Sequence, residues 1–233
     1  KISSSAMLVL RSFFRYEGKM QEVSNAIRLS SPHGPMMQIL GEISKCVSEG
    51  VQFSFSSSFY TSFVDLFIHL AASHDLHTAL LSSGALSMLC KTVESVSPVH
   101  YKYAEKVTVI LENLINKSTA TFEPFLNMDG LHMLVKKITS LVSTFDVACA
   151  SFLSAVLRVI ERLLVTFANE DRMRNLVETA LFDSLRIILQ DFEKYPGEIQ
   201  SHCIAIISAF IHNEPTSLSI LQERKVPQAM IDA

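Results

Sequence analysis

The sequence predicts an all-α fold built from a helical unit that recurs about every 45 to 50 residues. Four short stretches share one pattern, in which an anchor residue precedes an apolar segment. They begin at residues 84, 130, 180 and 225, in steps of 46, 50 and 45 residues, and a weaker copy begins at residue 34. A period of about 40 to 50 residues is typical of armadillo and HEAT repeats, which stack into right-handed α-solenoids.

The apolar residues between these anchors follow the period of an α-helix. Within residues 59–70 the apolar side chains fall at Phe59, Phe63, Leu66, Phe67 and Leu70, which form one stripe along a helix. Residues 131–142 and 152–164 have the same spacing. Residues 51–55 alternate too briefly to build a sheet, so we predict a loop that enters a helix.

Each copy predicts three helices in a fixed order. A long apolar helix is followed by a polar break, a short helix, the anchor and a further helix. The polar breaks are residues 73–75, 116–119, 169–171 and 212–215, where Ser, Asp and Asn can accept hydrogen bonds from the free N–H groups of the next helix. Pro215 fits the first turn of a helix, and Gly84 and Gly130 permit a tight or left-handed backbone between two helices.

Three helices in each unit favour armadillo over two-helix HEAT repeats. We therefore predict a single solenoid segment over residues 1–233, with about four to five repeats. Its high apolar content of 48% is expected for a slice of a longer solenoid, whose ends are apolar because they lack polar capping repeats. The repeats are anchored near Gly34, Gly84, Gly130, Ala180 and Lys225.

Composition and charge exclude several classes of partner. The formal net charge is −3 and Lys and Arg form no runs, so nucleic acid is not an expected partner. No uncharged apolar window of about 18 residues is present, so no membrane span is expected. The N-terminal residues lack the features of a signal peptide. These observations predict a protein of the cytoplasm, the nucleus or both.

No catalytic centre, metal site or cofactor is predicted. The sequence has no nucleophile elbow, no Gly-rich phosphate loop and no His-Glu-x-x-His helix. The four cysteines are far apart and fall in helical patterns, which favours buried thiols; they are Cys46, Cys90, Cys149 and Cys203. A histidine-rich cluster at residues 69–77 is expected at a helix corner, where polar side chains cap helices or face water.

One repeated basic position is a candidate for partner binding. Six or seven residues after successive anchors stand Lys91, Lys136, Lys137 and Arg186. Third helices of armadillo repeats line the concave surface, so these side chains could form a ladder that holds an acidic, extended segment. The alternative is that they are ordinary charges on solvent-facing helix surfaces.

The serine-rich residues 54–58 are interpreted as a solvated loop, with phosphorylation as the alternative.

Two stretches carry a family resemblance. Residues 124–131 read Pro-Phe-Leu-Asn-Met-Asp-Gly-Leu, and residues 210–217 read Phe-Ile-His-Asn-Glu-Pro-Thr-Ser, continuing to residue 229. Together they resemble the N-terminal armadillo region of giant HECT-type ubiquitin ligases, the group that also carries UBA and WWE modules. Residues 19–23 and 33–34 fit the same region. The sequence departs from the family at residues 224–226, where a small residue and a glycine are usual.

The resemblance implies a non-catalytic scaffold that helps to recruit substrates of the ligase. It implies protein substrates and neighbouring solenoid segments as partners, and a ubiquitin-conjugating enzyme that acts only through a HECT domain outside this chain. Asn213, Glu214 and Thr216 are candidate surface contacts, with helix capping at a repeat corner as the alternative. The competing hypothesis is a free-standing armadillo or HEAT adaptor that binds partner peptides in its concave groove.

Overall fold

Helices make up most of the described chain. The computed structural model describes residues 22, 25 and 30–232, apart from 55, 117, 169, 170 and 192. These residues contain no strand, and residues 51–54 form a loop before a helix, as predicted. Of the family-like residues 19–23, all but Glu22 lie outside the described residues. The chain divides into two units, Lys1–Gly130 and Leu131–Ala233, and each is described by itself.

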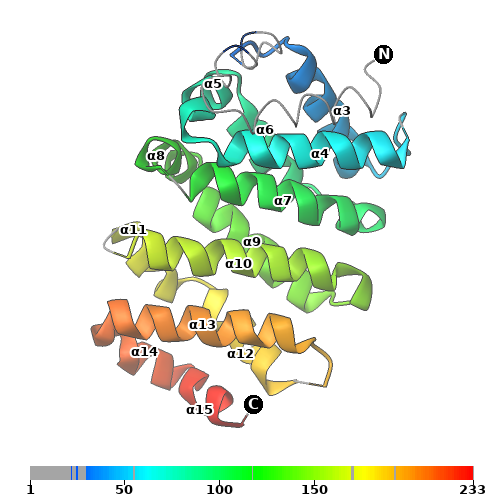
Figure 1. Ribbon diagram of the computed structural model, residues 1–233. Coiled ribbons are helices and arrows are strands. Elements are labelled where there is room, and N and C mark those ends of the chain that lie inside the picture. Colours follow the sequence, from blue (N-terminus) through cyan, green and yellow to red (C-terminus); the bar gives the residue numbers. More distant parts are fainter. Residues whose placement is uncertain are drawn as a thin grey trace. The chain divides into compact units, whose positions relative to one another are not determined.

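The first unit begins with α3, the third helix of one repeat, and continues with the helices of the next repeats. It contains α3 (Pro35–Glu49), α4 (Ser57–Ala72), α5 (His77–Ser82), α6 (Ala85–Glu94), α7 (Tyr101–Ile115) and α8 (Thr119–Asn127). Short 3₁₀ turns, His74–Leu76 and Pro98–His100, precede α5 and α7. The long helices α4 and α7 pack side by side, α3 packs on α6, and α5 packs on α8 (Figure 1).

The second unit begins with α9, the third helix of a repeat, and continues with two further repeats. It contains α9 (Gly130–Ser143), α10 (Ala150–Thr166), α11 (Asp171–Arg174), α12 (Leu181–Gln190), α13 (Gly197–Asn213), α14 (Leu218–Glu223) and α15 (Val226–Asp232). Its 3₁₀ turns are Val147–Cys149, Asn175–Glu178 and Pro215–Ser217. The helix α10 packs along α13, and α12 packs on both α13 and α15.

The predicted apolar stripes form the core of each unit. In α4, Phe63, Phe67 and Leu70 are fully buried, and in α10 the same is true of Phe152 and Ile160. Removing each such side chain from water stabilises the fold by about 1.5 to 3 kcal/mol. The helical period of the sequence therefore identified the buried faces correctly.

The anchors lie where third helices begin. Gly84 precedes α6 and has a left-handed backbone, with φ of 81°, as predicted for a glycine between two helices. At the equivalent joint before α9, the left-handed residue is Asp129, with φ of 58°. Gly130 is needed for close packing instead, because a Cβ atom there would lie 2.2 Å from a ring carbon of Phe125.

The last anchor lies where the sequence departs from the family pattern. Lys225 precedes α15 and adopts φ of 58°, a conformation that favours glycine. The other two anchors are not left-handed, since Gly34 has φ of −64° and Ala180 has φ of −72°. The joints thus share a position in the repeat but differ in backbone geometry. A single solenoid over the whole chain stays a prediction.

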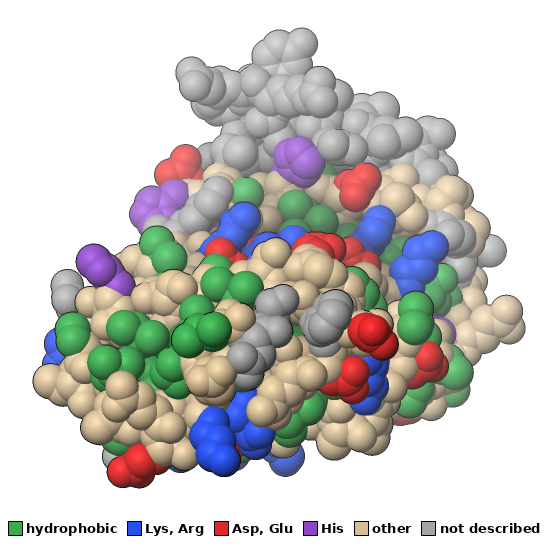
Figure 2. Space-filling view, turned by 90° about the horizontal axis from the view of Figure 1, so that it is seen from below, with side chains coloured by type: hydrophobic (Ala, Val, Ile, Leu, Met, Phe, Trp, Pro, Cys, Tyr) green, Lys and Arg blue, Asp and Glu red, His purple; other side chains and the backbone are tan. Residues whose placement is uncertain are grey.

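The open face of the second unit is partly apolar. Among the residues that α13, α14 and α15 expose are Ile204, Leu218, Ile220 and Ile231. Figure 2 shows hydrophobic side chains gathered on this face among polar ones.

Candidate functional site

A surface groove lies between neighbouring third helices in each unit. In the first unit the groove lies between α3 and α6. In the second unit it lies between α9 and the beginning of α12. Both grooves therefore occupy the same place in the repeat, which is where the predicted basic ladder should lie.

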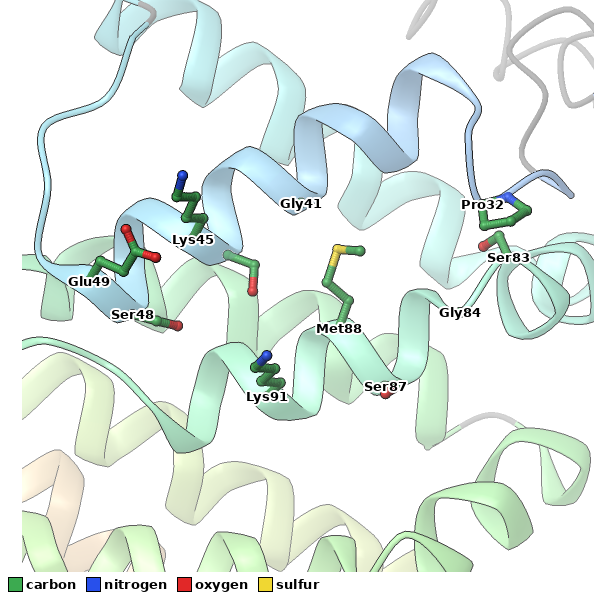
Figure 3. Close-up of a pocket in the computed structure, with 11 residues that line it drawn as sticks. Pro32, Gly41, Lys45, Ser48, Glu49, Ser83, Gly84, Ser87, Met88 and Lys91 are labelled. Carbon is green, nitrogen blue, oxygen red and sulfur yellow. The ribbon is translucent and has the colours of Figure 1, made fainter.

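The α3–α6 groove has a volume of about 540 Å³ and a mixed charge (Figure 3). Met88 projects from α6 toward Gly41 of α3, where a Cβ atom would lie 3.8 Å from the Met88 terminal methyl carbon. Lys91 points from α6 toward α3. The lining residues that decide the charge of this groove are Lys45, Glu49 and Lys91, and all three are exposed.

The α9–α12 groove has a volume of about 680 Å³ and a different charge. Its lining contains Lys136 and His132, both exposed on α9, and no carboxylate among the residues that the structure describes. The remaining lining residues are hydroxylated or small and apolar; they are Val135, Thr139, Ser140, Ser143, Thr179 and Ala180. This groove is therefore suited to an anionic group.

A pair of hydroxyl groups joins the two helices at each groove, and one member of each pair lines the groove. In the first unit, Thr92 Oγ1 lies 2.6 Å from Ser44 Oγ, and both side chains are buried. In the second unit, Thr139 Oγ1 lies 3.2 Å from Ser184 Oγ, and Thr139 is half-buried. Buried hydroxyl groups need such partners because an unpaired polar atom is costly to bury. Each pair therefore links two neighbouring third helices.

The predicted ladder is only partly represented in these grooves. Lys91 lines the α3–α6 groove and Lys136 lines the α9–α12 groove. Lys137 is half-buried on α9, and Arg186 is half-buried on α12, where its Nη1 donates to Gln190 Oε1 at 2.8 Å. Neither Lys137 nor Arg186 lines a described groove. Partner binding by the four residues stays a prediction.

Sequence reasoning missed several groove residues. Lys45 and His132 line the grooves but stand at other distances from the anchors than the six or seven residues that defined the ladder. The hydroxyl pairs Ser44–Thr92 and Thr139–Ser184 are separated by 48 and 45 residues. These separations match the repeat period, so a search for hydroxyl residues one period apart could have found them.

The second candidate site forms a corner of the second unit. Asn213 Nδ2 donates to the Leu164 carbonyl at the end of α10, at 3.1 Å. Glu214 pairs with Arg174 Nε at 3.1 Å and accepts a hydrogen bond from the Thr216 hydroxyl. The three predicted side chains thus hold α10, α11 and α13 together at a repeat corner. Their contact with a partner stays a prediction.

The cysteines are poorly suited to nucleophilic chemistry. All four are free; Cys46, Cys149 and Cys203 are buried and Cys90 is half-buried. Burial raises the pKa of Cys90 to about 12 and also raises the pKa of Cys203, so neither is a thiolate near neutral pH. His202 stands next to Cys203 in sequence, but its Nδ1 faces Glu161 Oε2 at 2.6 Å.

The histidine-rich corner is held by local hydrogen bonds. His77 is buried, and its Nε2 lies 2.9 Å from the Ala71 carbonyl oxygen. Within the described part of the chain, no group of three or more His, Cys, Asp or Glu side chains is placed to hold a metal ion. The helices of the described residues include none that is long and apolar enough to cross a membrane.

The fold is similar to that of a solved armadillo structure. A designed armadillo repeat protein matches 97% of this chain and 83% of its own length, with a TM-score of 0.62 and 16% sequence identity. At this identity the likeness concerns the fold alone. It confirms the predicted all-α, armadillo-like fold.

Sequence relatives point to ubiquitin ligases. The E3 ubiquitin-protein ligase ptr1 of Schizosaccharomyces pombe is 25% identical over 96% of this chain. The E3 ubiquitin-protein ligase TOM1 of Saccharomyces cerevisiae is 25% identical over 86%, and the probable TOM1 ligase of Eremothecium gossypii is 26% identical over 82%. These matches span 8%, 7% and 6% of the relatives, so the chain covers less than a tenth of their length.

One family model also matches part of the chain. It is described as a domain of unknown function, DUF913, and it covers residues 145–233, which hold α10 to α15. The match falls within the second unit, which contains the second of the two stretches that carried the resemblance. The resemblance predicted from the sequence is confirmed, because this chain is similar over most of its length to a segment of E3 ubiquitin-protein ligases and ends in a region that matches DUF913.

Proposed function

We propose that this chain is a non-catalytic scaffold segment of a HECT-type E3 ubiquitin-protein ligase and helps to recruit its protein substrates. The observation that carries the proposal is the similarity to E3 ligases over 96% of the chain. A stack of armadillo-like repeats with grooves between its third helices supports a role in binding other proteins. The site of action is the cytoplasm, the nucleus or both.

The state of the cysteines supports a non-catalytic role. A HECT-type ligase accepts ubiquitin as a thioester on cysteine, and thiolate is the form that attacks. Here the thiols are packed in helices, and burial raises the pKa of each. Thioester formation, and the meeting with a ubiquitin-conjugating enzyme, are therefore assigned to a HECT domain outside this chain.

The proposal is tested in the parent ligase. Charge reversal at Lys91 and Lys136, which line the two grooves, is expected to lower ubiquitination of substrates while ubiquitin still forms its thioester on the ligase. The matched control reverses charge at Lys194, which is exposed on the loop before α13 and lines neither groove. Equal substrate ubiquitination by the wild-type ligase, the groove variant and the Lys194 variant would contradict recruitment by the grooves. A ubiquitin thioester on the isolated chain would contradict the non-catalytic role.

A second candidate is a free-standing adaptor that binds partner peptides. It rests on the grooves between third helices, which could hold an extended peptide whether or not the parent protein is a ligase. The two candidates differ in what the parent transcript encodes after residue 233. A downstream HECT domain supports the ligase, whereas a stop codon soon after that residue supports the adaptor.

A further inference from the structure

We infer that the α9–α12 groove binds an acidic side chain of an extended protein segment, with Lys136 as its principal charge partner. The inference deepens the proposed function and rests on it in one respect, namely that the segment belongs to a substrate. The binding itself requires no ubiquitin transfer. It can therefore be measured separately from ligase activity.

The charge of the lining carries the inference. His132 and Lys136 are four residues apart on α9, so they lie on the same face of the helix, and both line the groove. The described lining contains no acidic side chain that would compete for Lys136. In the α3–α6 groove, by contrast, Glu49 shares the lining with Lys45 and Lys91. Of the two grooves, the second is the more favourable for a carboxylate.

The charges on α12 do not reverse this preference. Asp183 lies in the first turn of α12, but its Oδ2 is 3.1 Å from Arg224 Nη1, which offsets its charge. Arg224 also donates to the Thr179 carbonyl at 2.8 Å, and this holds it near the groove. The N-terminal end of α12 carries the positive end of the helix dipole. The paired Asp183 therefore does not oppose an anion at the groove, and the helix dipole favours one.

The shape of the lining favours a peptide over a small anion. Thr179 Oγ1 donates to the Leu176 carbonyl and accepts from Leu181 N–H, so this hydroxyl is already engaged. Ala180 is exposed and offers apolar surface to the aliphatic part of a side chain, whereas Val135 is buried in the lining. A lining that combines the Lys136 ammonium group with apolar surface suits the carboxylate and methylene groups of a Glu side chain. A chain running along the groove would place one such side chain at Lys136.

The test measures binding of a labelled peptide to the full 233-residue chain by fluorescence anisotropy. The probe is a short peptide of alternating Glu and Gly, and the comparison peptide has Gln in place of Glu. The Glu peptide is expected to bind more tightly, and Lys136→Glu is expected to weaken its binding by about tenfold. Added salt should reduce the difference between the peptides, because it screens exposed charges.

The matched variant is Lys91→Glu, which makes the same change in the α3–α6 groove. It is expected to alter binding by less than about twofold, and circular dichroism should show that both variants remain folded. Equal losses in the two variants would overturn the assignment to the second groove. Equal binding of the Glu and Gln peptides, or no binding of either, would overturn the charge recognition itself. Displacement of the Glu peptide by free glutarate at equal concentration would overturn the preference for a peptide.

Failure of this inference is distinguishable from failure of the proposed function. If Lys136→Glu weakens peptide binding but the parent ligase still modifies its substrates normally, the groove is a peptide site without a role in recruitment. If substrate ubiquitination falls while peptide binding is unchanged, the groove residues recruit substrates without recognising an acidic side chain. The inference of an acidic segment is then wrong.

Discussion

The α3–α6 and α9–α12 grooves occupy the same place in the repeat but differ in charge. Both lie between neighbouring third helices, and in both a hydroxyl pair links the two helices. The first mixes two lysines with Glu49, whereas the described lining of the second has Lys136 and His132 and no carboxylate. The two grooves thus share the hydroxyl contacts that pack neighbouring helices, whereas the charged side chains that face solvent differ between them.

The largest expected effect comes from removing the core support of one groove. Phe182 of α12 is fully buried and its ring lies 4.8 Å from that of Phe210. Phe182→Ala is expected to lower the free energy of unfolding by about 3 to 5 kcal/mol, because it leaves a cavity. Urea unfolding measures the loss. The matched variant Phe63→Ala changes the first unit, and only Phe182→Ala should also weaken binding of the Glu peptide.

Removing the hydroxyl pairs should produce the next largest loss in the free energy of unfolding. The two losses should show which pair contributes more to stability. Thr92→Val leaves the buried Ser44 hydroxyl without this partner and is expected to cost about 1 to 3 kcal/mol. Thr139→Val should cost less, since its bond to Ser184 is longer and Thr139 is half-buried. Thermal unfolding measures both. A larger loss for Thr139→Val would contradict the role assigned to burial.

The left-handed joints should respond in opposite directions to glycine and alanine. Gly84→Ala is expected to destabilise by about 1 to 2 kcal/mol, because a Cβ atom is unfavourable at φ of 81°. Lys225→Gly is expected to stabilise by up to about 1 kcal/mol, since a side chain with a Cβ atom is unfavourable at φ of 58° and this outweighs the added freedom of the unfolded chain. Chemical denaturation measures both changes. Destabilisation by Lys225→Gly would show that its side chain supports the joint.

Alkaline pH should reveal the protection of the thiol near the first groove. Burial raises the pKa of Cys90 from 9 to about 12, so the folded chain keeps this proton where the unfolded chain loses it. The free energy of unfolding therefore contains a contribution from Cys90 that is complete below pH 9 and declines as pH rises toward 12. Cys90→Ala is expected to flatten this decline in denaturation curves. An unchanged slope would contradict the shift.

The smallest effect should come from making the first groove resemble the second. Glu49→Gln removes the carboxylate from the α3–α6 lining. It is expected to tighten binding of the Glu peptide by up to about fivefold, a range typical of one exposed charge pair. Anisotropy titrations at low salt measure it, with Glu94→Gln as the control because Glu94 is exposed on α6 outside that lining. Equal tightening by both variants would point to net charge alone.

The helices and their buried faces were predictable because they depend on short spacings in the sequence. The stripe that includes Phe63 and Phe67 is buried as its period predicts. The joints were less predictable, since the left-handed residue before α9 is Asp129, whereas the sequence had pointed to Gly130. A glycine that provides space and one that provides backbone freedom look the same in a sequence.

The groove charges could not be predicted from the anchors alone. Lys45 enters the first groove because α3 packs on α6, although Lys45 and Lys91 are 46 positions apart in the sequence. Arg186 was expected in a groove, but it turns to Gln190 on its own helix. Which side chains share a groove depends on how neighbouring helices are offset, and helical period does not contain this information.

The flexibility of one groove wall has a further consequence for selectivity. Met88 lies across the α3–α6 groove against Gly41, and an unbranched thioether can change rotamer at low cost. In the α9–α12 groove the corresponding apolar surface includes Val135, whose branched Cβ permits few rotamers. We therefore expect the first groove to tolerate ligands of varied shape, and the second to discriminate among ligands that carry the same charge.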